Sequence, residues 1–312
     1  MELFPPLPLE EWNETKQTLH RFEQIVGKVR LQHSSRRNHW WNVPYHLTGR
    51  GITTRPMGMA DGNPVFTVDF DFVSHLLVAS NLEGDQVSFP LPGNSVASFY
   101  LRLQSALDSL GVDGSIRHAH PFDLPDSGRL FVEDHAHAVY VPEHATRFWR
   151  ILSQVNLVLE EFSAGFSGKV SPVHHFWHTF DIAVTRFSPH PVPQPESAGP
   201  VVREAYSREV VSSGFWFGDD AVPEPCFYSY TAPEPEGITG RGLVPPSAEW
   251  VESGHGHLAL LRYAQARKAP DPRATVLEFL ESAYRAGAEP AGWDIGALAC
   301  PGGVTDPYLS GR

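Results

Sequence analysis

The sequence contains few residues of the types that mark several common protein classes. Only two of its 312 residues are cysteine, Cys226 and Cys300, and neither belongs to a CxxC pair. A disulfide framework and a cysteine-based metal or redox motif are therefore excluded. So little cysteine is typical of a protein from the reducing cytosol, and we expect a cytoplasmic location.

Basic clusters and long apolar runs are also absent. Lysine and arginine total 24 against 36 aspartates and glutamates, which leaves a net charge of −12. Nucleic acids and anionic membranes attract basic faces, so we expect neither as a partner. The chain contains no apolar run of about eighteen residues, as a membrane span requires. Its first residues also lack the basic and apolar regions of a signal peptide.

Proline and glycine, in contrast, are abundant, with 28 and 26 residues, while charged residues make up 19% of the chain. This composition is typical of a globular protein with many loops, and a chain of this length can bury a sizeable core. We expect a small-molecule ligand or substrate as the partner. Composition does not define the oligomeric state.

The spacing of apolar residues divides the chain into helices and strands. Helices are predicted at 9–29, 95–111, 143–166 and 272–287. Strands are predicted within 64–91, 180–186, 207–217, 226–231 and 258–264. Consecutive strands joined by short turns indicate antiparallel sheets, so the predicted fold class is α+β.

One long pattern occurs twice in the chain. A histidine, a tryptophan and an arginine recur with identical spacing as His39, Trp41 and Arg50 and as His175, Trp177 and Arg186. Gly-Lys-Val precedes each set, at 27–29 and 168–170. We interpret the pattern as a degenerate internal duplication. The alternative is two unrelated corners, each with glycine at a helix end and a lysine that neutralises the helix C-terminus.

The duplication predicts two similar halves, each an antiparallel sheet with helices packed on one face, related by a pseudo-twofold axis. The first half covers residues 1–140 and ends in a connector rich in histidine and proline. The second half covers 141–293, and 294–312 is a tail. Binding sites favour such junctions, so a cleft between the halves should collect residues from both copies.

Residues 169–186, KVSPVHHFWHTFDIAVTR, place several titratable side chains inside an apolar run. Because unpaired polar groups are costly in a core, this stretch predicts a lined cavity. If it ends in a strand, Asp181 and Thr185 share one face. Six aromatic residues are interpreted as pocket lining rather than ordinary core: Trp40, Trp41, Phe176, Trp177, Phe215 and Trp216.

Three segments, GKVSPVHHFWHTFDIAVTRFS, EAYSREVVSSGFWFG and YTAPEPEG, resemble the bacterial domain-of-unknown-function family 5996. The resemblance covers nearly the whole chain and implies no activity, since the family has none assigned. It implies the following site residues: His39, Trp40, Trp41, Arg50, His137, Trp149, Lys169, His174, Trp177, Asp181, Arg186 and Glu209. His175, His178 and Arg208 depart from the family pattern, which indicates a modified site.

Acid–base catalysis on a small, carboxylate-bearing organic molecule is the function we expect for the cleft. The expected catalytic residues are His174, Asp181 and Glu209, which would handle protons. The expected substrate-binding residues are His39, Trp41, Arg50, His137, His175, Trp177, His178, Arg186 and Arg208. Among these the arginines are the groups that would hold a substrate anion.

Two alternatives stay open. The 16 histidines cluster at 174–178 and in His-x-His pairs at 118–120, 135–137 and 255–257, which favours a zinc or non-haem iron enzyme. If 174–181 were helical, His174, His178 and Asp181 would share a face, as an iron site requires. No cofactor is firmly implied. The other alternative is a non-catalytic binding or scaffold protein in which these groups pair internally.

Overall fold

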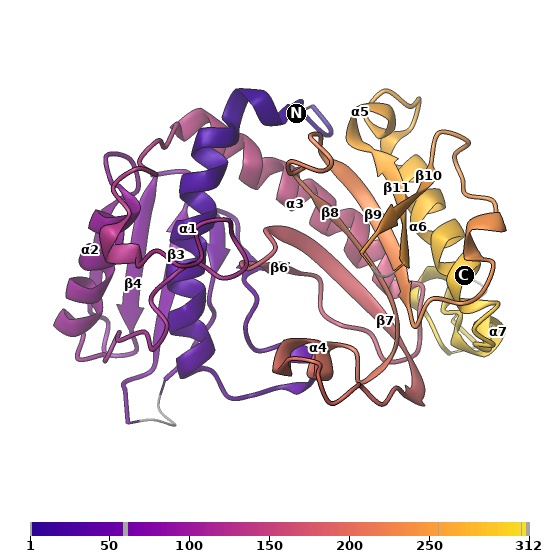
Figure 1. The fold of residues 1–312 in the computed structure, drawn as a ribbon, viewed down its shortest axis with the longest axis horizontal. Coiled ribbons are helices and arrows are strands. Elements are labelled where there is room, and N and C mark those ends of the chain that lie inside the picture. Colours follow the sequence, from indigo (N-terminus) through magenta and orange to yellow (C-terminus); the bar gives the residue numbers. More distant parts are fainter. Residues whose placement is uncertain (1, 59–61, 255, 307, 310–312) are drawn as a thin grey trace.

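The structure is a computed structural model that describes residues 2–58, 62–254, 256–306 and 308–309 (Figure 1). These residues form two antiparallel sheets accompanied by α-helices, which confirms the predicted α+β class. None of the helices in this part of the chain is both long and apolar enough to cross a bilayer.

The first sheet is a simple meander, with its strands in the order β1-β2-β3-β4-β5. Its strands are β1 (His46–Leu47), β2 (Gly51–Thr53), β3 (Phe66–Asp71), β4 (Leu76–Asn81) and β5 (Gln86–Pro90). Helix α2 (Val96–Ser109) follows the meander, and the Ser95 hydroxyl accepts a hydrogen bond from the Ser98 N–H at its start. Serine is a favoured N-cap residue, because its hydroxyl satisfies an N–H group of the first turn.

The second sheet has the order β10-β11-β9-β8-β7-β6. Its strands are β6 (His174–Phe176), β7 (Asp181–Pro191), β8 (Arg208–Trp216), β9 (Cys226–Ala232), β10 (Glu249–Ser253) and β11 (Gly256–Arg262). The helices α3 (Pro142–Ala164) and α6 (Pro272–Ala288) pack on this sheet. The sequence did not predict β10, because that short strand lacks a clear apolar alternation.

The remaining elements are short. They are α4 (Pro200–Ala205), α5 (Tyr263–Ala266), α7 (Ile295–Leu298) and the 3-10 helices η1 (Asn38–Trp40), η2 (Phe131–Glu133), η3 (Ile238–Gly240) and η4 (Pro301–Gly303). Helix α4 contacts η1, although about 160 residues separate them in the chain. This contact brings the region around Trp41 beside the second sheet.

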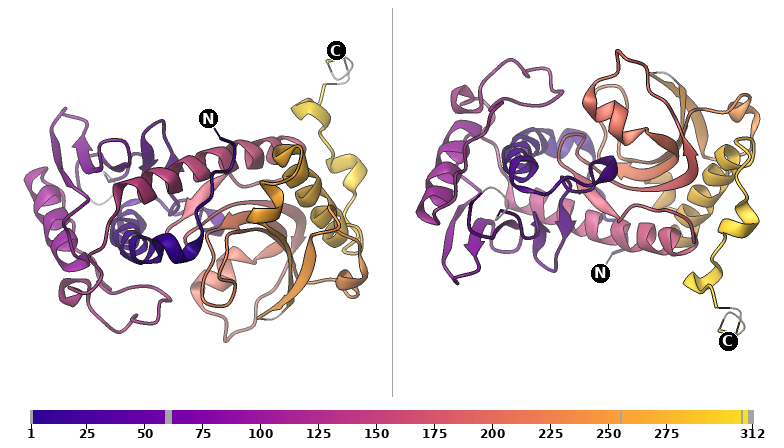
Figure 2. Two further views of the ribbon diagram at one scale, coloured as in Figure 1. Left: turned by 90° about the horizontal axis from the view of Figure 1, so that it is seen from above. Right: turned by 90° about the horizontal axis from the view of Figure 1, so that it is seen from below.

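Helix α1 (Leu9–His33) lies between the two sheets, and α3 extends along both parts of the molecule (Figures 1 and 2). Nearly every residue of α1 from Thr15 to Arg30 is buried, including charged ones. Arg21 binds Asp126 at 2.6 Å, and the Arg30 Nε donates to the Pro44 carbonyl at 3.0 Å. Buried polar groups must be paired, so these contacts fix the helix to its surroundings.

The Glu23–His175 pair joins α1 to the second sheet. The Glu23 carboxylate lies 2.7 Å from His175 Nε2, and both side chains are 0% exposed. Burial opposes charge on this imidazole, but the Glu23 carboxylate outweighs it and raises the pKa of His175. The His175 backbone also pairs with Tyr45 through hydrogen bonds of 2.8 and 3.0 Å. The two sheets therefore meet at the same residue that binds α1.

One continuous hydrophobic core runs from Phe4 to Trp293 and includes residues from both predicted halves. The order helix, antiparallel strands, helix occurs in each half, as the duplication predicts. The matched residues, however, occupy different settings, since Arg50 is exposed before β2 and Arg186 is buried in β7. The pseudo-twofold relation and the domain boundaries stay predictions.

We predict that replacing either member of the Glu23–His175 pair destabilises the protein strongly. Glu23→Gln and His175→Phe should each lower the free energy of unfolding by about 3–5 kcal/mol, because each leaves a buried polar partner uncompensated. The double variant should lose less than the sum of the two. Urea unfolding measures all three, with Glu11→Gln, from an exposed pair with Arg147, as a control expected to lose under about 1 kcal/mol. Strictly additive losses would contradict the pairing.

Candidate functional site

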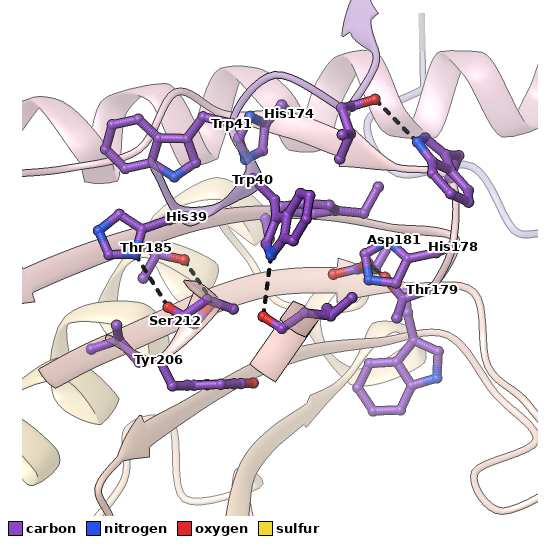
Figure 3. A pocket seen from close by; sticks show the side chains of 18 of the residues that line it. His39, Trp40, Trp41, His174, His178, Thr179, Asp181, Thr185, Tyr206 and Ser212 are labelled. Atoms are coloured by element: carbon purple, nitrogen blue, oxygen red, sulfur yellow. Dashed lines mark hydrogen bonds between the residues drawn. The ribbon is translucent and has the colours of Figure 1, made fainter. Parts of the chain in front are cut away.

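A cavity of about 540 Å³ lies on one face of the second sheet. It is bounded by β6, β7, β8 and β9, by α1, by the segment 39–43 and by α4. Figure 3 shows side chains from the segment 39–43 and from the strands around the cavity. Leu31, Thr179, Val201 and Asp219 line it and are exposed, so the cavity opens to solvent. Its size lies in the range of pockets that hold small molecules.

The alternation of β7 decides which residues face the cavity. Asp181, Ala183 and Thr185 line it, which confirms that this segment is a strand with Asp181 and Thr185 on one face. Ile182 and Arg186 point to the opposite face, toward α3 and α6. Residues an odd number of positions apart cannot share a face of a strand, so Asp181 and Arg186 cannot share the cavity.

Both predicted tryptophan regions line this one cavity. His39, Trp40 and Trp41 contribute from the first region, and 174 and 176–179 contribute from the second. Of the six predicted aromatic lining residues, Phe215 is the exception, because it lies on the core face of β8 and is fully buried. The cavity therefore combines segments that lie more than a hundred residues apart in the chain.

Trp177 is held by a close contact with α1. The ring packs over Gly27, where an added Cβ would lie 2.4 Å from the indole, and its Nε1 donates to the Val43 carbonyl at 3.1 Å. Gly27 therefore lies inside α1 as the residue that leaves room for Trp177. The sequence interpretation placed Gly27 and Lys28 at a helix end, but α1 continues to His33.

Asp181 is the carboxylate that lines the inner wall of the cavity, and it is 8% exposed. The Tyr228 hydroxyl donates to one carboxylate oxygen at 2.5 Å, and the Thr179 hydroxyl donates to the other. Burial, followed by the charge of Asp181, raises the pKa of Tyr228 well above 10.0. The tyrosine therefore remains protonated and acts as a fixed donor that positions Asp181.

His178 lies beside Asp181 and Thr179 (Figure 3). No described residue forms a hydrogen bond with its imidazole, although its backbone carbonyl accepts one from Gln24. Burial lowers the pKa of His178, while the Asp181 carboxylate opposes this change. A neutral imidazole next to a carboxylate can accept a proton, and the carboxylate then stabilises the imidazolium.

His174 lines the cavity at some distance from Asp181. Its Nδ1 is buried and has no hydrogen-bond partner among the described residues. Burial, and then the proximity of His46, lowers the pKa of His174 well below 6.5. No carboxylate contributes to this shift, so His174 is a neutral side chain that lacks an acidic partner.

His39 is fully engaged on the other side of the cavity. Its Nδ1 lies 3.1 Å from the Glu204 carbonyl and its Nε2 lies 2.6 Å from Lys169 Nζ. A carbonyl accepts hydrogen bonds only, so Nδ1 carries the proton and Nε2 accepts from Lys169. Burial, and then the Lys169 ammonium, lowers the pKa of His39. The residue thus connects η1 to α4 and contributes only its ring face to the cavity.

The backbone is strained at three positions next to the cavity. His39, Trp40 and Phe180 have φ values of 54°, 61° and 59°, in the left-handed region that residues other than glycine rarely adopt. Such conformations cost about 1–3 kcal/mol each and cluster at functional sites. Phe180 directly precedes Asp181, so this backbone conformation helps to orient the Asp181 carboxylate toward the cavity.

The three arginines predicted to hold a substrate anion do not line the cavity. Arg50 is exposed and binds Asp71 at 2.8 Å. Arg208 donates to the Pro189 carbonyl. The Arg186 guanidinium lies 3.7 Å from the centre of the Phe162 ring, and its Nη1 lies 3.3 Å from Glu281. Each arginine is committed to a partner of its own, so none of them can act as the predicted anion holder of this cavity.

Three further predicted site residues also lie outside the cavity. Glu209 accepts hydrogen bonds from Ser188 at 2.7 Å and from the Trp293 indole at 2.9 Å. His137 binds Asp134 at 2.8 Å, and His175 binds Glu23. The structure does not bring Glu209 together with His174 and Asp181. Glu209 lies near the start of β8, whereas Asp181 pairs with Trp216 at the other end of that strand.

The predicted histidine clusters do not converge on one point. Within 174–178, His174 lines the cavity, His175 is buried against Glu23, and β6 is a strand rather than the helix an iron site would need. Among the described residues, Asp126, Asp134 and His137 have ligand atoms within 4.8 Å of one another. Arg21 binds Asp126 at 2.6 Å, and Arg129 lies 3.5 Å from Asp134, so two arginines already neutralise the two carboxylates. His255, from the pair at 255–257, lies outside the described residues.

Sequence reasoning missed three polar residues that matter for the chemistry of the cavity. Tyr228 and Thr179 hold Asp181, and Lys28 lines the wall formed by α1. Lys28 belongs to the Gly-Lys-Val pattern, from which a charge at a helix end is predicted. This prediction is wrong, because α1 continues to His33. Tyr228 carries no local signal, because its partner Asp181 is 47 positions away in the sequence.

Comparison with known proteins gives a family and no function. Residues 4–300 match the family of unknown function DUF5996, which confirms the resemblance seen in the sequence. No curated protein and no solved structure matches the chain.

We predict that the protein loses stability as pH falls from about 6.5 toward 5. Burial is the largest cause that lowers the pKa of His20 and of His46 to about 3. The unfolded chain protonates these residues near pH 6.5 but the folded chain does not, so each contributes a slope of up to about 1.4 kcal/mol per pH unit. His175, with a raised pKa, is protonated in both states below pH 6.5 and adds no slope.

Urea unfolding at pH 7.5, 6.5 and 5.5 measures this dependence. His46→Phe should flatten the slope, whereas His135→Phe, at an exposed position, should leave it unchanged. A wild-type stability that stays constant or rises as the pH falls from 6.5 to 5.5 would contradict the neutral, buried state of these histidines.

We also predict that Gly27→Ala destabilises the protein. Alanine is the better helix former by about 1 kcal/mol. The overlap of its Cβ with Trp177 should nevertheless produce a net loss of about 1–3 kcal/mol in the free energy of unfolding. In a Trp177→Leu background the same replacement should be neutral or stabilising, as thermal or urea unfolding would measure. An equal loss in both backgrounds would rule out the contact as the cause.

Proposed function

We propose that this chain, which belongs to the DUF5996 family of unknown function, is an enzyme and that its cavity is the active site. The substrate is a small organic molecule with a largely apolar body. The chemistry is general acid–base catalysis, in which His178 and Asp181 handle the proton.

The observation that carries this proposal is the placement of His178 beside Asp181 in a cavity open to solvent. The imidazole is unengaged and uncharged at neutral pH, whereas the carboxylate is held by the hydroxyls of Tyr228 and Thr179. A free base next to a fixed carboxylate supports proton abstraction from a bound molecule. His174, the base expected from the sequence, lacks such a carboxylate.

The aromatic wall supports the choice of substrate. Trp40, Trp41, Phe176, Trp177 and Trp216 surround the cavity from several sides. Flat apolar groups bury large areas against such rings and gain from stacking. A molecule with an aromatic or hydrocarbon body therefore fits this cavity better than a sugar or a nucleotide phosphate.

A non-catalytic binding protein is the second candidate. It is favoured by the engagement of both carboxylate oxygens of Asp181, each of which accepts a hydrogen bond from a hydroxyl. Under this alternative the carboxylate and the tyrosine would shape the cavity without transferring a proton. Turnover distinguishes the two candidates, because both predict binding.

The test is depletion of small molecules from a mixture. Purified wild-type protein is incubated with a metabolite extract rich in aromatic and branched-chain compounds, and the mixture is followed by mass spectrometry. We expect a compound that the wild type consumes and that Asp181→Asn and His178→Gln consume about 10²–10⁴ times more slowly.

Binding of that compound to each variant is measured separately by calorimetry. His190→Gln, at an exposed position outside the cavity, is the control and should retain wild-type turnover. Binding without consumption by the wild type would favour the second candidate. Consumption that is unaffected in Asp181→Asn would place the chemistry elsewhere.

A further inference from the structure

Lys28 is an ammonium group in the cavity wall without a counter-ion. Its side chain is 8% exposed, and no described residue forms a hydrogen bond or an ion pair with its Nζ. Burial alone lowers the pKa of Lys28, and no carboxylate contributes to that shift. The Nζ atom is not among the fully buried atoms that lack a partner, so the ammonium reaches the cavity surface. A largely desolvated charge that no residue pairs is costly.

The other buried cations show that this protein normally pairs such groups. Lys16 donates to the Gly218 carbonyl, Arg21 binds Asp126, Arg30 donates to the Pro44 carbonyl and Arg186 donates to the Phe162 carbonyl. Lys28 alone among the buried lysines and arginines of the described chain has no such partner. It is also the cation of this group that lines the cavity.

We propose that Lys28 binds a carboxylate of the ligand, so that the cavity takes small organic acids with an aromatic or hydrocarbon body. This inference rests on the proposed function of the cavity and deepens it by assigning the ligand class and the residue that selects it. A single ammonium in an apolar wall matches one negative charge. A phosphate dianion would leave one charge unmatched, because Lys28 is the only lysine or arginine among the described residues that line the cavity.

The positions of the charges also orient the ligand. Asp181 does not contribute to the pKa shift of Lys28, although both residues line the same cavity. The acid group therefore binds at Lys28 on α1, and the body of the molecule extends between the aromatic rings toward Asp181 and His178. Repulsion from Asp181 disfavours the reverse orientation.

Matched acid and amide pairs test this assignment. Benzoate, phenylacetate and indole-3-acetate are compared with their primary amides by isothermal titration calorimetry on the full chain. We expect at least one wild-type pair in which the acid binds about tenfold to a hundredfold more tightly than its amide, because a charge-assisted contact to Lys28 is available only to the acid. Lys28→Met should reduce the acid to the affinity of the amide and leave the amide unchanged.

Two variants serve as controls. Lys28→Arg should retain part of the preference for the acid, and Lys268→Met, at an exposed position, should retain all of it. Lys28→Met should also unfold at the same or a higher urea concentration than the wild type without ligand, since it removes an unpaired buried charge. A purely structural lysine would lose stability instead.

The outcomes separate this inference from the proposed active site. Equal binding of acids and amides by the wild type, or an acid preference that survives Lys28→Met, would overturn the role of Lys28 and leave the cavity as a binding site. If no acid and no amide binds, both the inference and the proposed function fail. Binding without consumption by the wild type bears on catalysis alone.

Discussion

The buried contact between Glu23 and His175 is the constraint on which the rest of the structure depends. It joins the central helix α1 to β6, and the same histidine forms the backbone bridge to Tyr45 that brings the two sheets together. Neither partner can be buried alone without a large loss of solvation energy. The position of α1, the junction of the sheets and the start of the cavity wall are therefore set together.

The cavity follows from this junction and from the alternation of β7. One face of the strand packs Ile182 and Arg186 toward the helices, and the other presents Asp181 and Thr185 to the hollow. Gly27 lets Trp177 approach α1, so the indole forms part of the wall instead of filling the space. The strained turn at Phe180 and the donors Tyr228 and Thr179 then hold Asp181 in place. In this way the packing that stabilises the fold also creates a preorganised polar group in an apolar cavity.

The chemistry of the cavity is unevenly distributed. In the function that we propose, Asp181 and His178 handle the proton, and Lys28 supplies the unpaired positive charge. Aromatic side chains form much of the remaining lining. This arrangement would provide one cationic anchor and one reactive end, which is why a small organic acid with an apolar body is the ligand class we favour.

The sequence by itself determined the α+β class, the principal helices and strands of both sheets, the shared face of Asp181 and Thr185 and most of the aromatic lining. These features depend on periodicities of two and 3.6 residues, which are local and can be read from neighbouring positions. Only the tertiary structure decided which polar residues are free. Arg186, Glu209 and His175 resemble site residues in sequence, but segments far away along the chain supply their partners. Lys28 resembles a helix-end charge and yet faces the cavity, because Trp177 packs over Gly27 and α1 continues past it. Hydrogen bonds and ion pairs between distant segments depend on three-dimensional packing, so they cannot be predicted from the spacing of neighbouring residues.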